Sequence, residues 1–321
     1  MPMKNLSLFI AGALLLLGAS EVPGAEKKAA FPQKAIEYIV GFAPGGKDDI
    51  EARGIAPYLE KYLGVRVIIQ NFPGAGGRIG YTKLFNAKPD GYTIGGFPLP
   101  AVIVGEYLAT VGYKTQEFTP IFACFVTPKV LAVPADTYQN LDDFIKAGKA
   151  KQFSNATPGY GTSSHLVGIV VANALGLKEV KHVHFEGAGA PTALAGKHVD
   201  FSISNLPTIL PLVRAGKLKP LLVVADERDS AFPQVPTPKE FGWKMTTING
   251  IDGVTGPPGV PLERVKVLEK AFAKAASDPE FLAWAQRAGM SVKPLDHDKY
   301  RQEIAEIVKE VEKYKEFLIK K

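Results

Sequence analysis

Short apolar runs typical of strands alternate with segments of helical periodicity along most of this chain. The first series predicts strands over residues 36–42, 65–70 and 92–96, separated by helices over 50–63 and 78–87. A repeated β-α-β order implies mainly parallel sheets with right-handed crossovers. The chain is therefore predicted to be an α/β protein.

A second series follows Phe118 and predicts a second lobe. Its strands are expected at 130–133, 152–155, 181–184, 201–204 and 221–224, with a helix at 163–175. Three helices finish the chain, at 261–276, 279–288 and 296–320. If these helices return to the first lobe, the chain crosses twice and leaves a cleft where solutes bind at strand ends.

The crossings are expected at two Pro-rich or Gly-rich connections, near 127–129 and 233–238. We therefore predict that residues 26–128 and 235–321 form the first lobe and that residues 129–234 form the second. The apolar tail positions Ile304, Ile307, Val308, Val311, Tyr314 and Phe317 recur at helical spacing. We expect that helix to pack on the first lobe.

The N-terminus resembles a secretory signal. Lys4 precedes an apolar run over 8–18, and small residues follow at 18–20 and 22–25. We expect residues 1–25 to be a cleavable signal peptide and the mature protein to be periplasmic; a retained membrane anchor is the alternative. The single cysteine, Cys124, lies in an apolar run and is expected to be buried.

The net charge is +6, and the basic residues are spread along the chain. This distribution is compatible with anionic small molecules and argues against nucleic acid as a partner.

The glycine run Asn71-Phe-Pro-Gly-Ala-Gly-Gly-Arg-Ile-Gly80 raises the question of a dinucleotide site. Its spacing from Gly74 is one residue longer than G-x-G-x-x-G, and no acidic residue stands about 20 positions on, at the expected strand end. The run is therefore interpreted as a turn into a helix, and no cofactor is expected.

Two other loops, one in each series, join a strand to a helix and suit anion binding. In the loop over 41–49, Gly45 and Gly46 let main-chain N–H groups approach a ligand, while Asp49 binds ligand or caps the helix. The loop over 157–165 carries Gly159 and Gly161. It adds three hydroxyl side chains, those of Thr162, Ser163 and Ser164. Loops facing each other in this way would clamp a carboxylate from both ends.

With these loops in view, the chain resembles the extracytoplasmic solute receptors of tripartite tricarboxylate transporters, the Bug family. Eight segments carry the likeness in one order: "FPQKAIEYIVGFAPGG" with Asp49, "ARGIAPYL", "NFPGAGGRIG", "KPDGYTI", "GYGTSSH", "RAGKLKPLLV", "PQVPTPKEFG" and "GPPGVP". The resemblance implies a two-lobed periplasmic-binding-protein fold of type II-like organisation, without catalysis, in which the two glycine loops hold the ligand between the lobes. We expect a small carboxylate ligand, a membrane permease partner, no bound metal and a monomeric receptor.

The ligand-binding residues expected from the loops and the resemblance come from both lobes. They are Phe42, Ala43, Gly45, Gly46, Asp49, Gly159, Gly161, Thr162, Ser163, Ser204 and Asn205. Aliphatic dicarboxylates, aromatic carboxylates, acidic amino acids and nicotinate-like compounds all remain open as ligands.

The chain departs from the family at two places. Lys47 and Asp48 stand where small hydroxyl residues are usual. Lys47 either adds a cation to an anion site or points into solvent, and solvent is the expectation. The usual proline-tyrosine-lysine-glycine turn reads His184-Phe185-Glu186-Gly187, so a lysine is replaced by a glutamate.

Three other functions are conceivable from the residue types. Ser163 or Ser164 beside His165 does not make a hydrolase, because adjacent residues at a helix start do not face each other and no G-x-S-x-G is present. His182, His184 and Glu186 alternate and could hold a metal. A sensor or scaffold that binds the same ligand and then a signalling partner is the remaining alternative to transport.

Overall fold

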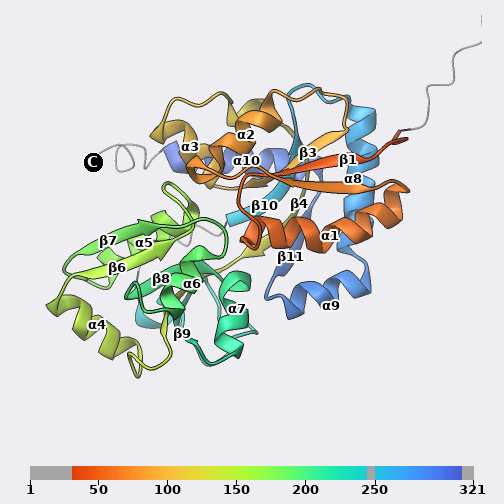
Figure 1. Ribbon diagram of the computed structural model, residues 1–321. Helices are drawn as coiled ribbons and strands as arrows, with labels where there is room; N and C mark the ends of the chain where they lie inside the picture. The colour runs from red at the N-terminus through yellow and green to blue at the C-terminus, as the bar shows by residue number, and fades with distance from the viewer. Residues whose placement is uncertain (1–30, 244–249, 313–321) are drawn as a thin grey trace, which may run out of the picture. The chain divides into compact units, whose positions relative to one another are not determined.

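The structure is a computed structural model that describes residues 31–243 and 250–312, in which two mixed sheets and their helices form an α/β fold (Figure 1). The first sheet has the strand order β11-β4-β10-β3-β1-β2. Its strands are β1 (Ile36–Val40), β2 (Val67–Asn71), β3 (Thr93–Pro98), β4 (Thr119–Thr127), β10 (Gly250–Gly256) and β11 (Ser291–Leu295). The predicted signal peptide lies outside the described residues.

The second sheet has the order β7-β6-β8-β5-β9. Its strands are β5 (Lys129–Pro134), β6 (Phe153–Thr157), β7 (Val180–His184), β8 (Phe201–Asn205) and β9 (Leu218–Val224). The chain passes from the first sheet to the second at Pro128 and returns between β9 and β10. We call the first sheet with its helices lobe 1 and the second lobe 2; their boundaries in sequence remain a prediction.

The α/β prediction is confirmed, but the expectation of mainly parallel sheets is wrong. In lobe 1, β1 runs parallel to β2 and β3, whereas β10 is antiparallel to β3 and β4. In lobe 2, β6 is parallel to β7 and β8, whereas β5 is antiparallel to β8 and β9. β11, at the edge of the first sheet, is also antiparallel to its neighbour β4. Of the antiparallel strands, β5 and β10 are the two that follow the crossings. A strand that arrives from the other lobe is not bound by the β-α-β handedness that keeps strands parallel.

Ten helices of the described ranges pack around these sheets. They are α1 (Lys47–Leu63), α2 (Arg78–Phe85), α3 (Ala101–Leu108), α4 (Leu141–Ala150), α5 (Ser163–Ala174), α6 (Gly189–Ala195), α7 (Leu206–Arg214), α8 (Leu262–Ala276), α9 (Pro279–Arg287) and α10 (His297–Glu312). None of these helices has the length and apolarity needed to cross a membrane.

Helix α10 packs on lobe 1, as the tail pattern predicts. Tyr300, Ile304 and Val311 are buried in the same apolar core as the strands of the first sheet. The Tyr300 hydroxyl donates to the carbonyl of Phe97 at 3.1 Å, and Gly253 leaves room for the ring. Two further positions of the pattern, 314 and 317, lie outside the described residues.

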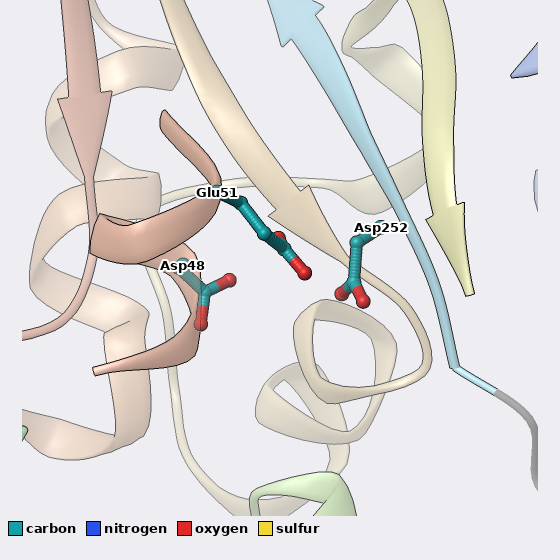
Figure 2. A group of neighbouring side chains, drawn as sticks. All are labelled: Asp48, Glu51 and Asp252. Carbon is teal, nitrogen blue, oxygen red and sulfur yellow. The ribbon is translucent and has the colours of Figure 1, made fainter. Parts of the chain in front are cut away.

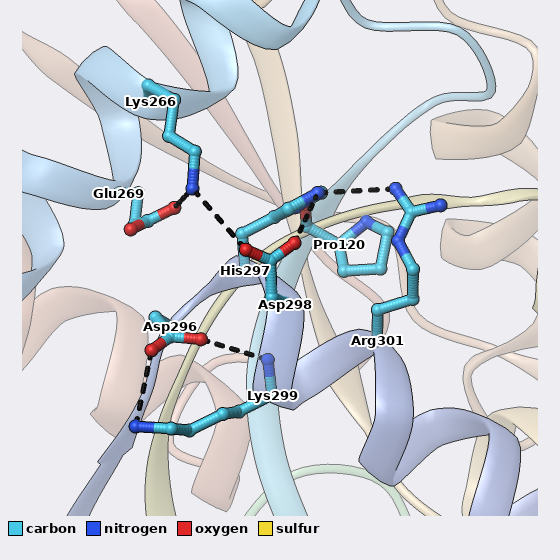
Figure 3. A network of polar contacts seen from close by, with 8 residues as sticks. All are labelled: Pro120, Lys266, Glu269, Asp296, His297, Asp298, Lys299 and Arg301. Carbon is cyan, nitrogen blue, oxygen red and sulfur yellow. Dashed lines mark hydrogen bonds and ion pairs between the residues drawn. The ribbon is translucent and has the colours of Figure 1, made fainter.

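A polar network fixes the start of α10 (Figure 3). The buried His297 ring donates from Nδ1 to the carbonyl oxygen of Pro120 in β4, 2.6 Å away. Arg301 donates to the other ring nitrogen at 3.3 Å, which requires the neutral tautomer. The last described helix is therefore tied to the strand that precedes the first crossing.

Candidate functional site

A narrow cavity lies between the lobes, at the carboxyl ends of several strands. The space inside it that the centre of a water-sized sphere can reach is about 30 Å³. Only a few waters or a small solute therefore fit unless the cavity opens further. Its lining comes from both lobes: Phe42, Gly46, Lys47, Asp48, Pro98, Ala101, Pro158, Thr162, Ser163, Ser164, Gly187, Ala190, Pro191, Ser204, Asn205 and Thr208.

Helix N-termini surround this cavity. Lining residues come from the first turns of four helices, α1, α3, α5 and α7. Each of these helices has at least eight residues. The first N–H groups of a helix have no acceptor within it, and the aligned peptide dipoles add partial positive charge there. Such ends bind anions, each contributing about 0.3–1 kcal/mol and up to roughly 2 when partly buried.

The predicted ligand-binding residues fall into two groups. Six line the cavity: Phe42, Gly46, Thr162, Ser163, Ser204 and Asn205. The other five stand behind them in the loops: Ala43, Gly45, Asp49, Gly159 and Gly161. Phe97 of β3 packs against Phe118 in the lobe 1 core and is not part of the cavity lining.

Asp49 holds the lobe 1 loop in place. Its carboxylate accepts from the main-chain N–H of Gly45 at 2.9 Å, from Arg53 at 2.9 Å and from the Asn71 side chain at 2.9 Å. Burial opposes ionisation, but these three donors together lower the pKa of Asp49. Asn71 also donates to the carbonyl of Phe42 at 2.8 Å. Asn71, the first residue of the "NFPGAGG" run, therefore stabilises the neighbouring loop.

Thr162 plays a similar part in lobe 2. As N-cap of α5 its hydroxyl donates to the carbonyl of Gly159 at 2.8 Å and accepts from the N–H of His165 at 3.3 Å. Nδ1 of His165 accepts from the N–H of Gly161 at 3.2 Å. The Thr162 hydroxyl is therefore engaged within its own loop, although the residue lines the cavity.

Two polar atoms in the lining are buried without a partner among the described residues: the hydroxyl of Ser164 and the side-chain oxygen of Asn205. A buried polar group left unpaired is destabilising, by about 1–3 kcal/mol. Both atoms are at the starts of helices, α5 and α7, in lobe 2. Ser164 was not among the predicted site residues; its place as the second residue of α5, beside Ser163, was the available signal.

Glycines bring the backbones of the two lobes close together at one side of the cavity. A Cβ atom on Gly46 would lie 3.5 Å from the Cα of Gly187. One on Gly76 would lie 2.5 Å from the carbonyl oxygen of Tyr160, and one on Gly159 would lie 3.4 Å from the Cα of Gly76. The glycine run of lobe 1 therefore touches the "GYG" loop of lobe 2.

The expectation that Lys47 points into solvent is wrong. Lys47 is 6% exposed, and its ammonium donates to the Asp252 carboxylate of β10. Carboxylate oxygens of Asp48 and Glu51 lie 3.7 Å and 3.8 Å from the same nitrogen. The flexible carbon chain of a lysine ordinarily lets its ammonium reach water. Here three carboxylates surround the Lys47 nitrogen and stabilise the ammonium in the protein interior. Figure 2 shows these three carboxylates converging from α1 and β10.

Lys129, the first residue of β5, joins this group and completes what we call the buried charge cluster: Lys47, Asp48, Glu51, Lys129 and Asp252. Burial tends to lower the pKa of Lys47, but the carboxylates of Asp252, Asp48 and Glu51 outweigh it and raise that pKa. Burial, with Lys47 nearby, lowers the pKa of Lys129 to about 8. Burial raises the pKa of Asp48 and, with Asp252 adding to it, that of Glu51.

The alternative of a metal bound by His182, His184 and Glu186 finds no support in the geometry. Nδ1 of His182 lies 3.1 Å from the Asn155 amide nitrogen, and Nδ1 of His184 lies 2.7 Å from the Thr157 hydroxyl. Glu186 is exposed, on the turn after β7. Within the described ranges, only Asp48, Glu51 and Asp252 bring three metal-ligating groups together, and Lys47 already lies among them.

The ring of His165 lies between those of His182 and His184, with centroids 4.8 Å from each. Burial, then the two neighbouring rings, lowers the pKa of His165 to about 4, from an ordinary value of 6.5. Between these pH values the unfolded chain binds a proton at this site and the folded chain does not. The free energy of unfolding should therefore fall as the pH is lowered from about 6.5 to 4.

Chemical denaturation across this pH range checks the expectation. His165→Asn should reduce the pH dependence without abolishing it, because burial also lowers the pKa values of the neighbouring His182 and His184. His198→Gln, at an exposed histidine, should leave the pH dependence as in the parent protein. An equal slope in all three proteins would contradict the assignment.

Comparison with known proteins adds to this geometry. Residues 51–321 match the sequence model described as the tripartite tricarboxylate transporter family receptor. A UPF0065 protein of Bordetella pertussis is 33% identical over 300 residues, 90% of this chain and 90% of that protein.

Two solved structures are similar over nearly the whole chain. The periplasmic binding protein BugD superposes with a TM-score of 0.83 at 28% identity, over 89% of this chain and 98% of that one. MatC of Rhodopseudomonas palustris, solved with bound malate, gives a TM-score of 0.80 at 25% identity, over 90% and 100% of the two chains.

Proposed function

Since this chain belongs to the tripartite tricarboxylate transporter receptor family, whose members are periplasmic solute-binding receptors and not enzymes, we propose that it captures a small carboxylate and delivers it to the membrane permease of such a transporter. The ligand occupies the cavity between the lobes. The malate in MatC, a relative of the same fold, supports a carboxylate as the ligand class.

The observation that carries this proposal is the pair of unpartnered buried polar atoms, Ser164 Oγ and Asn205 Oδ1, in a cavity ringed by helix N-termini. The Ser164 hydroxyl can donate to an anionic oxygen. The amide of Asn205 can accept or, with its nitrogen turned inward, donate. Neither α5 nor α7 has an acidic residue in its first turn to compete with a ligand. A carboxylate placed here would satisfy buried groups that are otherwise unpaired.

Thermal unfolding of the mature, refolded protein against a panel of carboxylates tests the proposal. Refolding removes ligand that is carried over from expression. A stabilisation that grows with the logarithm of one acid's concentration is expected, because the ligand binds the native state alone. Nicotinamide dinucleotides and zinc serve as controls; a shift with either of these and none with any acid would reject the carboxylate.

Ser164→Ala and Ser163→Ala should each weaken binding of the acid so identified by about 0.5–1.5 kcal/mol, the usual net contribution of one hydrogen bond. This is roughly a two- to twelve-fold rise in Kd, measurable by isothermal titration calorimetry. Ser230→Ala, at an exposed serine outside the cavity lining, is the matched control. Unchanged affinity in both cavity variants would remove the start of α5 from the site.

Delivery to a permease is distinguished from signalling by the partner. Ligand-dependent co-purification with the permease subunits would support transport. Co-purification with a sensor protein alone would replace transport by signalling as the proposed function.

N-terminal sequencing of exported protein tests the signal peptide, with cleavage expected within residues 19–25.

A further inference from the structure

We infer that the ligand carries a positively charged group beside its carboxylate, and that Asp48 is the residue that receives it. This rests on the proposed function and narrows its ligand class to amino acids and similar zwitterions. The inference comes from a difference between the two walls of the cavity.

The two walls of the cavity differ in charge. On the lobe 2 side, Ser164 and Asn205 are 1% and 8% exposed, line the cavity and leave polar atoms unpartnered. On the lobe 1 side, the first turn of α1 holds two carboxylates, Asp48 and Asp49, and the ammonium of Lys47, which also lines the cavity, is engaged by Asp252. Asp49 is occupied by the donors that fix its loop. Asp48 lines the cavity itself, with a side chain 11% exposed.

With all its groups ionised, the buried charge cluster behind this wall would carry more negative than positive charge. The buried charge cluster contains three carboxylates, from Asp48, Glu51 and Asp252, against the two ammonium groups of Lys47 and Lys129. Lys47 donates to Asp252, and Lys129 donates to the carbonyl of Thr127 at 3.4 Å. One oxygen of Asp252 is buried without a partner among the described residues. Burial and Asp252 hold the pKa of Asp48 above its usual range despite Lys47, as expected where positive charge is lacking.

A ligand ammonium placed against Asp48 would supply the missing charge and leave the ligand carboxylate facing α5 and α7. A metal ion would instead meet the ammonium of Lys47, which already lies within 4.0 Å of all three carboxylates. A second ligand carboxylate in the same place would face Asp48 and be repelled. The cavity thus favours an amphoteric small molecule over a dicarboxylate of similar size.

Calorimetric titration of the mature, refolded protein with matched pairs of acids tests this directly. Each pair differs by one ammonium group: aspartate and succinate, glutamate and glutarate, phenylalanine and 3-phenylpropionate, 4-aminobutyrate and butyrate. We expect one amino-bearing member to bind at least tenfold more tightly than its partner. Asp48→Asn should reduce that ratio to near one, mainly by weakening the amino-bearing acid.

Asp142→Asn is the matched control, because Asp142 is likewise the second residue of its helix, α4, but is exposed and outside the cavity. It should leave the ratio unchanged. If Asp48→Asn folds poorly, Asp48→Ser is a second variant for the same test. The comparison of paired acids on the parent protein requires no variant at all.

Equal or tighter binding of the acid without nitrogen would overturn the inference and leave the proposed function intact. Equal weakening of both members of a pair by Asp48→Asn would also overturn it, since Asp48 would then act only on the fold. Failure of every acid to bind would reject the proposed function together with the inference.

Discussion

Lys47→Met is expected to lower the free energy of unfolding by about 3–5 kcal/mol, the effect of removing one partner from a buried ion pair. The methionine has a similar length but leaves the Asp252 carboxylate, 4% exposed, without its ammonium. Asp48 and Glu51 lose the same neighbour. Equilibrium denaturation in urea at neutral pH measures the loss.

Two further variants show whether the loss of stability comes from the buried, unpaired charge or from replacing a lysine anywhere. Lys197→Met removes an ion pair with Asp136 in which both side chains are more than half exposed, so a change of no more than about 1 kcal/mol is expected. Adding Asp252→Leu to Lys47→Met should restore part of the stability, because an apolar pair replaces an uncompensated charge. A double variant less stable than Lys47→Met alone would contradict this account of the cluster.

Gly46→Leu is expected to abolish ligand binding while the protein remains folded. Gly46 has φ −73° and ψ 165°, a conformation open to any residue, so a side chain there causes no backbone strain. Its Cβ, however, would lie 3.2 Å from the carbonyl oxygen of Ala43 and 3.5 Å from the Cα of Gly187 in lobe 2. The remaining atoms of a leucine would then fill the cavity or hold the lobes apart.

Gly46→Ala should bind more weakly than the parent protein but measurably, because only the Cβ enters this contact. Gly196→Leu is the control, at an exposed position with φ −79° where an added Cβ would meet the exposed His198 ring, 2.9 Å away, which must turn aside. It should bind as the parent does. Calorimetry measures the affinities and circular dichroism the fold. Full affinity in the leucine variant at Gly46 would show that this contact does not form in the ligand-bound protein.

Sequence patterns predicted the two strand-to-helix loops because the information they need is local. A strand, a pair of glycines and a helix start within ten residues identify each loop, and both contribute to the cavity. The start of α9 is equally local: Asp278 caps it by accepting from the N–H of Glu280 at 3.0 Å.

The buried charge cluster could not be predicted in this way. Lys47 and Asp252 are 205 residues apart and meet only because the chain returns to lobe 1 after building lobe 2. Without that partner, the polar run 47–49 looks like a solvated loop, so α1 was expected to begin at residue 50 and begins at Lys47. Strand β10 was missed for a related reason: its glycines lower the propensity for strand, and pairing between β3 and β4 stabilises it instead.

The glycine contacts between the lobes lower the entropic cost of closing them and so affect how fast the receptor binds and releases ligand. Ordering a long side chain such as glutamine or lysine costs about 1.5–2 kcal/mol of rotamer freedom, whereas glycine has no rotamers to lose. Where Gly46 approaches Gly187, and Gly76 approaches Gly159, closure of the lobes freezes no side-chain torsions of these residues. Ligand binding then has less disorder to overcome at these glycine contacts, and opening them releases no side chain of these four residues. A receptor that binds and releases its solute repeatedly benefits from contacts of this kind.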